Sequence, residues 1–187
     1  MSPAAKDCQS DEEDPGDQFD EEMQIRYPYQ EYNNSAYSEF MLKLMNCLEI
    51  RHYSKNIVIA SEIDECLEVI FVEQGYYKIG YQINNHGFYR IRFGMFTVIG
   101  GFNVCYDRRF NFMFKTVTDI KALAIRKSKF KQLLSEYKDF AMQIKHKFWK
   151  HYCQNIYLPL RKHKNADLSK HNQRKDFKQV LILKNKL

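Results

Sequence analysis

The sequence has no apolar run that approaches the ~18 residues needed to cross a bilayer, and its first residues lack the basic-then-apolar order of a secretory signal. Its five cysteines are odd in number, widely spaced and form no Cys-x-x-Cys pair. A disulfide framework and a zinc knuckle are therefore both disfavoured. These absences predict a protein of a reducing compartment, in the cytoplasm.

Motifs for catalysis are also missing. There is no Gly-x-Ser-x-Gly, no His-Glu-x-x-His and no Walker loop. The offsets between His146, His151 and Cys153 are five and two, whereas metal ligands on one helical face need a spacing of three or four. The acidic residues from Glu62 to Glu68 lack the glycine and the alternating oxygen ligands of a calcium loop. We therefore expect no enzymatic activity and no metal.

Aromatic residues and uneven charge are what the sequence does have. It is 44% hydrophobic and 15% aromatic, with 13 Tyr and 14 Phe, which predicts a globular domain with an aromatic, β-leaning core. Residues 1–49 hold 3 Lys or Arg against 12 Asp or Glu, while the remainder holds 26 against 11. We expect an acidic disordered head over residues 1–34, one domain over 35–157 and a basic tail over 158–187.

Hydrophobic periodicity predicts a helix, then a β region, then two helices. An amphipathic helix is expected from residue 35, with Ser38 as its N-cap. Asn84 to Gly87 has the composition of a hairpin turn. Helical stripes follow over 130–137, with Ser128 as the N-cap, and over 140–156, where Pro159 is expected to end the helix. The short β-branched or aromatic runs are 48–53, 57–60, 67–72, 76–83, 88–93, 97–99, 102–106, 110–116 and 122–125.

This order of parts, and several local motifs, resemble the cyclic-nucleotide-binding domain family. The stretch from Leu67 to Gly75 is similar to that family's strand-and-glycine signature. The segments 98–100, 102–103, 108–109 and 112–115 resemble the cassette of one subgroup, the C-terminal cytoplasmic domain of ciliate-type voltage-gated potassium channels. The resemblance implies a mainly β fold: a jelly-roll-like β-roll of about eight strands, with one N-terminal and two C-terminal helices.

The same resemblance implies that the nucleotide cassette is degenerate. Aligning Gly100 with the family's glycine places Gly101 where a ribose-binding glutamate stands, and Phe110 where an arginine holds the cyclic phosphate. Asn111 and Phe112 then replace the small residues that let the backbone approach the phosphate. Bulky side chains would occupy the space that the sugar phosphate needs, so we expect no cofactor and a pocket filled by the protein's own aromatic rings.

Three functions remain open from the sequence. The preferred one is a non-enzymatic regulatory domain of the potassium-channel type, in which the helix carrying Phe140, Ile144, Phe148 and Tyr152 is the gating element. The second is a genuine cyclic AMP or cyclic GMP sensor that uses Arg109 or Arg108 as the phosphate partner. The third is a structural adaptor that docks through its acidic head and basic tail.

Partner expectations follow from these functions. A protein partner or a channel assembly is expected, with a homo-oligomer as an alternative. Membrane contact is expected only indirectly, through a channel partner on the cytoplasmic side or through the basic tail. The basic stripe from Lys145 to Lys164 does not amount to a strong nucleic-acid signal.

Overall fold

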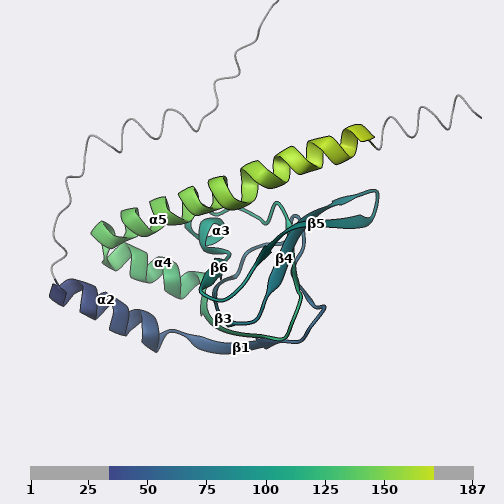
Figure 1. The fold of residues 1–187 in the computed structure, drawn as a ribbon. Helices are drawn as coiled ribbons and strands as arrows, with labels where there is room; N and C mark the ends of the chain where they lie inside the picture. The colour runs from purple at the N-terminus through teal and green to yellow at the C-terminus, as the bar shows by residue number, and fades with distance from the viewer. Residues whose placement is uncertain (1–33, 171–187) are drawn as a thin grey trace, which may run out of the picture. The chain divides into compact units, whose positions relative to one another are not determined.

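The computed structural model describes residues 34–170, which form two antiparallel sheets and a set of helices (Figure 1). The helices are α2 (Asn34–Asn46), α3 (Gly101–Cys105), α4 (Lys127–Glu136), α5 (Lys138–Tyr152) and the π-helical η1 (Cys153–Tyr157). The strands are β1 (Glu49–Tyr53), β2 (Val58–Ala60), β3 (Glu68–Gln74), β4 (Tyr77–Ile83), β5 (His86–Phe93), β6 (Thr97–Ile99), β7 (Met113–Thr116) and β8 (Ile120–Arg126). The predicted disorder of the acidic head concerns residues that lie outside this range, apart from the first residue of α2.

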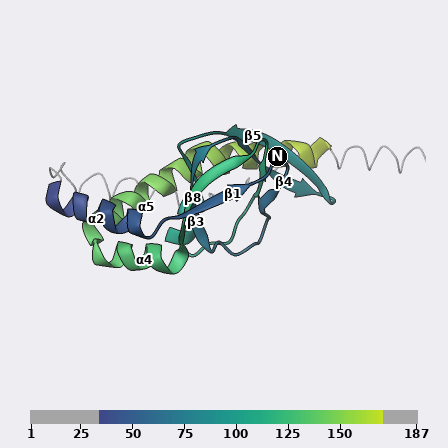
Figure 2. The ribbon, with the colours of Figure 1, turned by 90° about the horizontal axis from the view of Figure 1, so that it is seen from below.

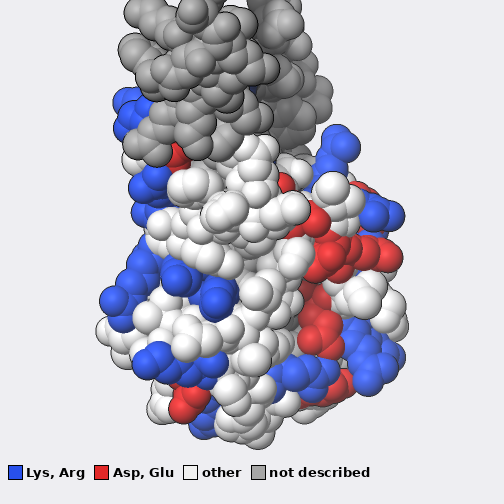
Figure 3. Space-filling model, turned by 90° about the vertical axis from the view of Figure 1, so that its right-hand side faces the viewer, with Lys and Arg blue, Asp and Glu red and all other residues white. Residues whose placement is uncertain are grey.

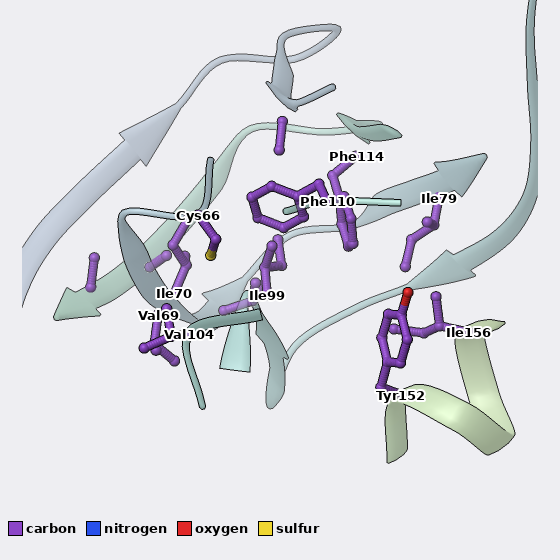
Figure 4. Packing of buried hydrophobic residues seen from close by; sticks show 14 of the residues in the cluster. Cys66, Val69, Ile70, Ile79, Ile99, Val104, Phe110, Phe114, Tyr152 and Ile156 are labelled. Carbon is purple, nitrogen blue, oxygen red and sulfur yellow. The ribbon is translucent and has the colours of Figure 1, made fainter. Parts of the chain in front are cut away.

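The fold class predicted from the sequence is confirmed. Within the described residues eight strands form two four-stranded sheets, in the orders β1-β8-β3-β6 and β2-β7-β4-β5. Every strand pair is antiparallel, as in a β-roll. Figure 4 shows the core, where Ile70 and Ile99 of one sheet lie near Ile79 and Phe114 of the other. The buried surface of these side chains is the main source of the sheets' stability.

The helices gather at one end of the sheets. Figures 1 and 2 agree that α2 and α4 lie near the first half of α5, and that α5 then continues across the roll. The ring of Phe40 in α2 stacks on Phe140 of α5 at a centroid distance of 5.8 Å and meets Tyr137 edge-on at 5.5 Å. These aromatic contacts fix the start of α5 against α2.

The hairpin between β4 and β5 confirms the predicted turn. Asn84 and Asn85 have φ angles of 50° and 65°, and Ile83 pairs with His86. Two consecutive positive φ angles are typical of a two-residue hairpin turn whose twist matches that of the flanking strands. Asparagine tolerates these angles. Local turn chemistry was therefore sufficient to predict this hairpin.

The predicted strand at 102–106 is wrong, because this segment forms helix α3. Gly100 ends β6 with a φ of +81°, and its carbonyl accepts a hydrogen bond from the N–H of Val104 at 2.9 Å. Gly101 and Val104 are both buried, which is a helical spacing of three. The β-branched and aromatic residues suggested a strand, but the left-handed glycine redirects the chain.

Both predicted N-caps are also wrong. Ser38 lies inside α2, and Ser128 is the second residue of α4. At α4 the chain leaves strand β8 through Arg126, whose φ and ψ are −63° and 140°. The N–H of Lys127 donates to the carbonyl of Leu67 at 2.7 Å. A backbone carbonyl beside the sheet therefore satisfies the first amide of α4, and the N-cap residue Arg126 makes no side-chain capping bond.

Pro159 does not end the last helix, which corrects the expectation from the sequence. Residues 158–170 are helical and continue directly from η1, so the predicted domain boundary at 157 falls inside one helix. The N–H of Leu158 donates to the carbonyl of Cys153, five residues earlier. This wider turn leaves a carbonyl without an intrahelical donor, and a proline, which has no N–H, is accommodated at such a place. Leu160, the next residue, is fully buried.

Candidate functional site

The two glycines of the cassette allow close packing on both sides of α3. A Cβ atom at Gly101 would lie 2.8 Å from the ring of Phe148, and one at Gly100 would lie 2.7 Å from the Sγ of Cys66. Real Cβ contacts are not this short, so any side chain would push α5 or β3 away. The position where the family resemblance implied a lost glutamate is therefore the position on which the Phe148 ring rests.

Tyr152 reaches the cassette one turn further along α5. Its ring is parallel to that of Phe102, with a centroid distance of 4.0 Å and an interplanar angle of 3°. Its hydroxyl accepts a hydrogen bond from the Nδ2 of Asn111 at 3.0 Å. Burial raises the pKa of Tyr152 to about 12, so the phenol is neutral at physiological pH. We call the packing of Gly101, Phe102, Phe148 and Tyr152 the proximal contact.

The arginine pair lies on the outside of the cassette loop. Arg108 and Arg109 are both exposed, and the Nη1 of Arg109 donates to the carbonyl of Ile63 at 3.2 Å. Buried Asn103 holds this loop through two hydrogen bonds. Its side-chain Nδ2 donates to the carbonyl of Arg109 at 2.8 Å, and its backbone carbonyl accepts from the N–H of Arg108 at 2.9 Å. Asp107, in the same loop, pairs with Lys127 and Lys131. The hydrogen bond from Lys131 is the main reason why the pKa of Asp107 is lowered.

The aromatic residues of the cassette are buried in the roll. Phe110 and Phe112 are 7% and 5% exposed, and Phe110 meets Phe114 edge-on at 5.3 Å, as Figure 4 shows. Phe112 approaches Tyr157 of η1 at 6.4 Å. These rings lie at the sequence positions where the resemblance placed a phosphate-binding arginine and a small residue.

A cavity of about 240 Å³ remains between α3, β6 and α5. Of the predicted site residues, Gly100, Gly101, Phe148 and Tyr152 line it, whereas neither arginine does. Phe96, which is 86% exposed and has a φ of 62°, stands at its rim. The other lining residues are Thr97, Val98, Phe102, Asn103, Phe114, Lys147, His151 and Ile156.

The remaining predicted gating residues contact other parts of the domain. Phe140 stacks on Phe40, and half-buried Ile144 packs against the core. The predicted helix face is therefore divided. Its first half contacts α2, and its second half, with Phe148 and Tyr152, contacts the cassette.

A second contact of the same helix was not predicted from the sequence. Asp167, whose side chain is 15% exposed, accepts hydrogen bonds from the hydroxyl of Tyr81 at 2.6 Å and from Arg90 at 2.5 Å. Lys164 pairs with Glu62 at 3.3 Å. The signal that could have identified this site is composition, since Asp167 is the only carboxylate between residues 158 and 170. We call these five residues the distal contact.

The cysteines nearest the cassette are unsuited to nucleophilic chemistry. Burial raises the pKa of the Cys66 thiol to about 12 and that of Cys105 to about 11. Thiolate, the reactive form, is therefore scarce at both positions at neutral pH.

Charge is unevenly spread over the surface. On the face seen in Figure 3, basic side chains follow the left edge, and most of the acidic side chains lie toward the right, with further basic side chains among them. In the described part of the last helix, Lys147, Lys150, Arg161 and Lys162 make no ion pair within 4.0 Å with a described carboxylate. No described helix has both the length and the apolar character required to span a membrane.

Comparison with known proteins supports the fold and goes no further. No protein-family profile and no curated protein matches the sequence. The structure is similar to a transcriptional regulator from Thermotoga maritima, with a TM-score of 0.51 and 19% identity, covering 60% of this chain and 88% of that chain. As many as 375 chains of solved structures match, so the architecture is widely used. The likeness shows a shared β-rich fold.

Proposed function

We propose that this chain is a non-enzymatic regulatory domain of the cyclic-nucleotide-binding type, in which α5 itself occupies the cassette. The observation that carries the proposal is the proximal contact. Phe148 rests on Gly101, and Tyr152 stacks on Phe102 and accepts a hydrogen bond from Asn111. The output is the position of α5, and the cassette side chains bias it.

Exposure of the two arginines supports a site that does not depend on a cyclic phosphate. A phosphate in a β-roll pocket needs a fixed bidentate counter-charge. Arg109 donates instead to the Ile63 carbonyl, and the ring of Phe110 is buried. The resemblance to potassium-channel domains makes a channel subunit the expected partner.

The alternative is a cyclic-nucleotide sensor, which the cavity beside Gly100 and Gly101 favours. For such a sensor the cassette loop would have to turn Arg109 inward, away from Ile63. The charge of Arg109 would then be required for affinity.

Calorimetry with cyclic AMP and cyclic GMP separates the two functions. We expect no saturable heat from either nucleotide with the wild-type chain or with Arg109→Ala. Saturable heat in the wild type that Arg109→Ala removes would establish the sensor and overturn the proposal. Arg126→Ala serves as the control for loss of an exposed arginine, because Arg126 is the last residue of β8 and its side chain, which pairs with Glu49, is 67% exposed.

Helix displacement is the direct test of the proposed output. Trp149 is the only tryptophan in the chain and lies on α5, so its fluorescence reports on this helix. Gly101→Glu would place a side chain in the space of the Phe148 ring. We expect a changed Trp149 emission in a chain that keeps the wild-type far-ultraviolet circular dichroism. Unchanged emission in such a folded variant would contradict a cassette that controls α5.

A further inference from the structure

The cavity under α5 has a polar side and an aromatic side. Lys147 and His151 are four residues apart, so they lie on one face of α5, and both line the cavity. The rings of Phe102, Phe114 and Phe148 line it as well. The lining therefore suits a ligand that combines an apolar planar body with a group that accepts hydrogen bonds.

The hydrogen bonds of His151 determine which of its ring nitrogens can donate. The Nδ2 of Asn155 lies 3.1 Å from the Nδ1 of His151, and an amide nitrogen is a donor. With the Asn155 amide in this orientation, Nδ1 accepts and the proton of the neutral ring is on Nε2. Burial lowers the pKa of His151, which keeps the ring neutral at pH 7. Exposed Lys147 adds a cation, so the α5 side of the cavity carries a cation and a neutral N–H donor.

The cavity is large enough for a ligand of one or two rings. An apolar cavity of roughly 150 Å³ is enough to bind benzene. The cavity here is about 240 Å³, and no arginine lines it to hold a cyclic phosphate.

We propose that this cavity binds a small aromatic carboxylate. The ring enters among Phe102, Phe114 and Phe148, and the carboxylate accepts hydrogen bonds from the Lys147 ammonium and the His151 Nε2–H. This inference rests on the proposed function in one respect: such a ligand touches both the cassette and α5, so its binding would bias the helix.

Calorimetry of the whole chain with phenylacetate and indole-3-acetate tests the proposal. Phenylacetamide and indole-3-acetamide are the matched neutral probes, since each keeps the ring and removes the charge. We expect saturable binding of at least one acid, and its amide should bind at least about tenfold more weakly, because a charge-assisted hydrogen bond is stronger than a neutral one. Absence of saturable heat from both acids at millimolar concentration overturns the proposal. An amide that binds as tightly as its acid overturns the carboxylate.

Two lysine variants locate the site. Lys147→Met should weaken binding of the acid about tenfold. Lys150→Met is the control, because Lys150 is also exposed on α5 and does not line the cavity. Equal weakening by both variants would indicate attraction by the surface charge of α5 and would overturn the site. The comparison of acid and amide uses the wild-type chain, so it remains decisive if either variant fails to fold.

Trp149 fluorescence separates this inference from the proposed function. An acid that binds in a Lys147-dependent way and shifts the emission supports both. Binding without any shift leaves the ligand site supported and counts against control of α5 by the cassette. If Gly101→Glu shifts the Trp149 emission but the wild-type chain binds neither acid, control of α5 by the cassette is supported and the ligand site is overturned.

Discussion

The long C-terminal helix is held at two places by different kinds of interaction. At the proximal contact, Phe148 and Tyr152 pack on Gly101 and Phe102 through ring surfaces and one neutral hydrogen bond. At the distal contact, Asp167 and Lys164 meet β4, β5 and the segment before β3 mainly through charge. Salt does not screen aromatic packing, whereas it does screen ion pairs that are partly exposed, as Arg90 and Lys164 are. The first contact therefore holds the helix, and the second orients its end.

The largest expected effect is the loss of the Tyr152 ring. Tyr152→Ala removes the stack on Phe102 and leaves the Asn111 amide without its acceptor, so the free energy of unfolding should fall by about 3–5 kcal/mol. Tyr152→Phe keeps the stack and should cost only about 1 kcal/mol. Urea unfolding followed by Trp149 fluorescence measures both. Equal losses would mean that the ring stack contributes nothing.

Adding a methyl group at Gly101 should also weaken the proximal contact. In an ordinary helix glycine to alanine is stabilising, but a Cβ here would lie 2.8 Å from Phe148. We expect Gly101→Ala to lower the free energy of unfolding by about 1–3 kcal/mol. Phe148→Leu in the same chain should recover part of this loss, and Phe148→Leu alone completes the double-mutant cycle. A stabilised Gly101→Ala protein would show that the helix is not seated on this glycine.

At the distal contact the expected effect is smaller. Asp167→Asn keeps the shape of the side chain and removes its charge. Because its partner Arg90 is 38% exposed, the free energy of unfolding should fall by only about 1 kcal/mol. Hydrogen exchange at the amides of residues 158–170 should become faster, while exchange in residues 144–152 stays unchanged. Lys162→Gln, on an exposed position of the same helical stretch, is the control. Faster exchange in both segments would mean that the two contacts form one unit.

Lowering the pH should remove the stability that the Asp167 carboxylate contributes, without any mutation. Hydrogen bonds from Tyr81 and then Arg90 lower the pKa of Asp167 in the folded chain. A lowered folded pKa contributes stability above the unfolded pKa of about 3.9, and this contribution is lost as the pH falls through the folded value. The difference in stability between the wild type and Asp167→Asn should be constant from about pH 5 to 8 and shrink below about pH 4. If the stability difference between the wild type and Asp167→Asn shrinks near pH 7, a titrating group other than Asp167 is responsible for the pH dependence.

The smallest expected effect is at Arg109. Its side chain is exposed, and its Nη1 donates a hydrogen bond to the Ile63 carbonyl. Arg109→Ala should change the free energy of unfolding by less than about 0.5 kcal/mol and leave Trp149 emission unaltered. A large change in either property would show that the cassette loop is coupled to α5 more strongly than its geometry suggests.

The fold could be predicted because its signals are local. Runs of β-branched and aromatic residues identified the strands, and the asparagine pair identified the hairpin. The segment 102–106 has the same composition but folds as α3, because Gly100 turns the chain at the end of β6. Propensity gave the wrong element where one left-handed residue decided the direction of the backbone.

The site could be predicted only in part. The sequence singled out Gly101, Phe148 and Tyr152. It did not indicate that the Phe148 ring packs directly on Gly101. That relation depends on the distance between α3 and α5, which tertiary packing sets. Asp167 was hidden in a segment assigned to a tail, since Pro159 was expected to end the helix before it.

The π turn at Cys153–Tyr157 explains how one continuous helix can make both the proximal and the distal contact. A π turn takes up one residue more than an α turn, and each residue of an α-helix advances the direction of its side chains by about 100°. Deleting one residue from this turn would rotate everything beyond it by that angle. Leu160 would swing out of the core and Asp167 away from Tyr81. The extra residue therefore sets the phase of the helix, and with it which strand the far end faces.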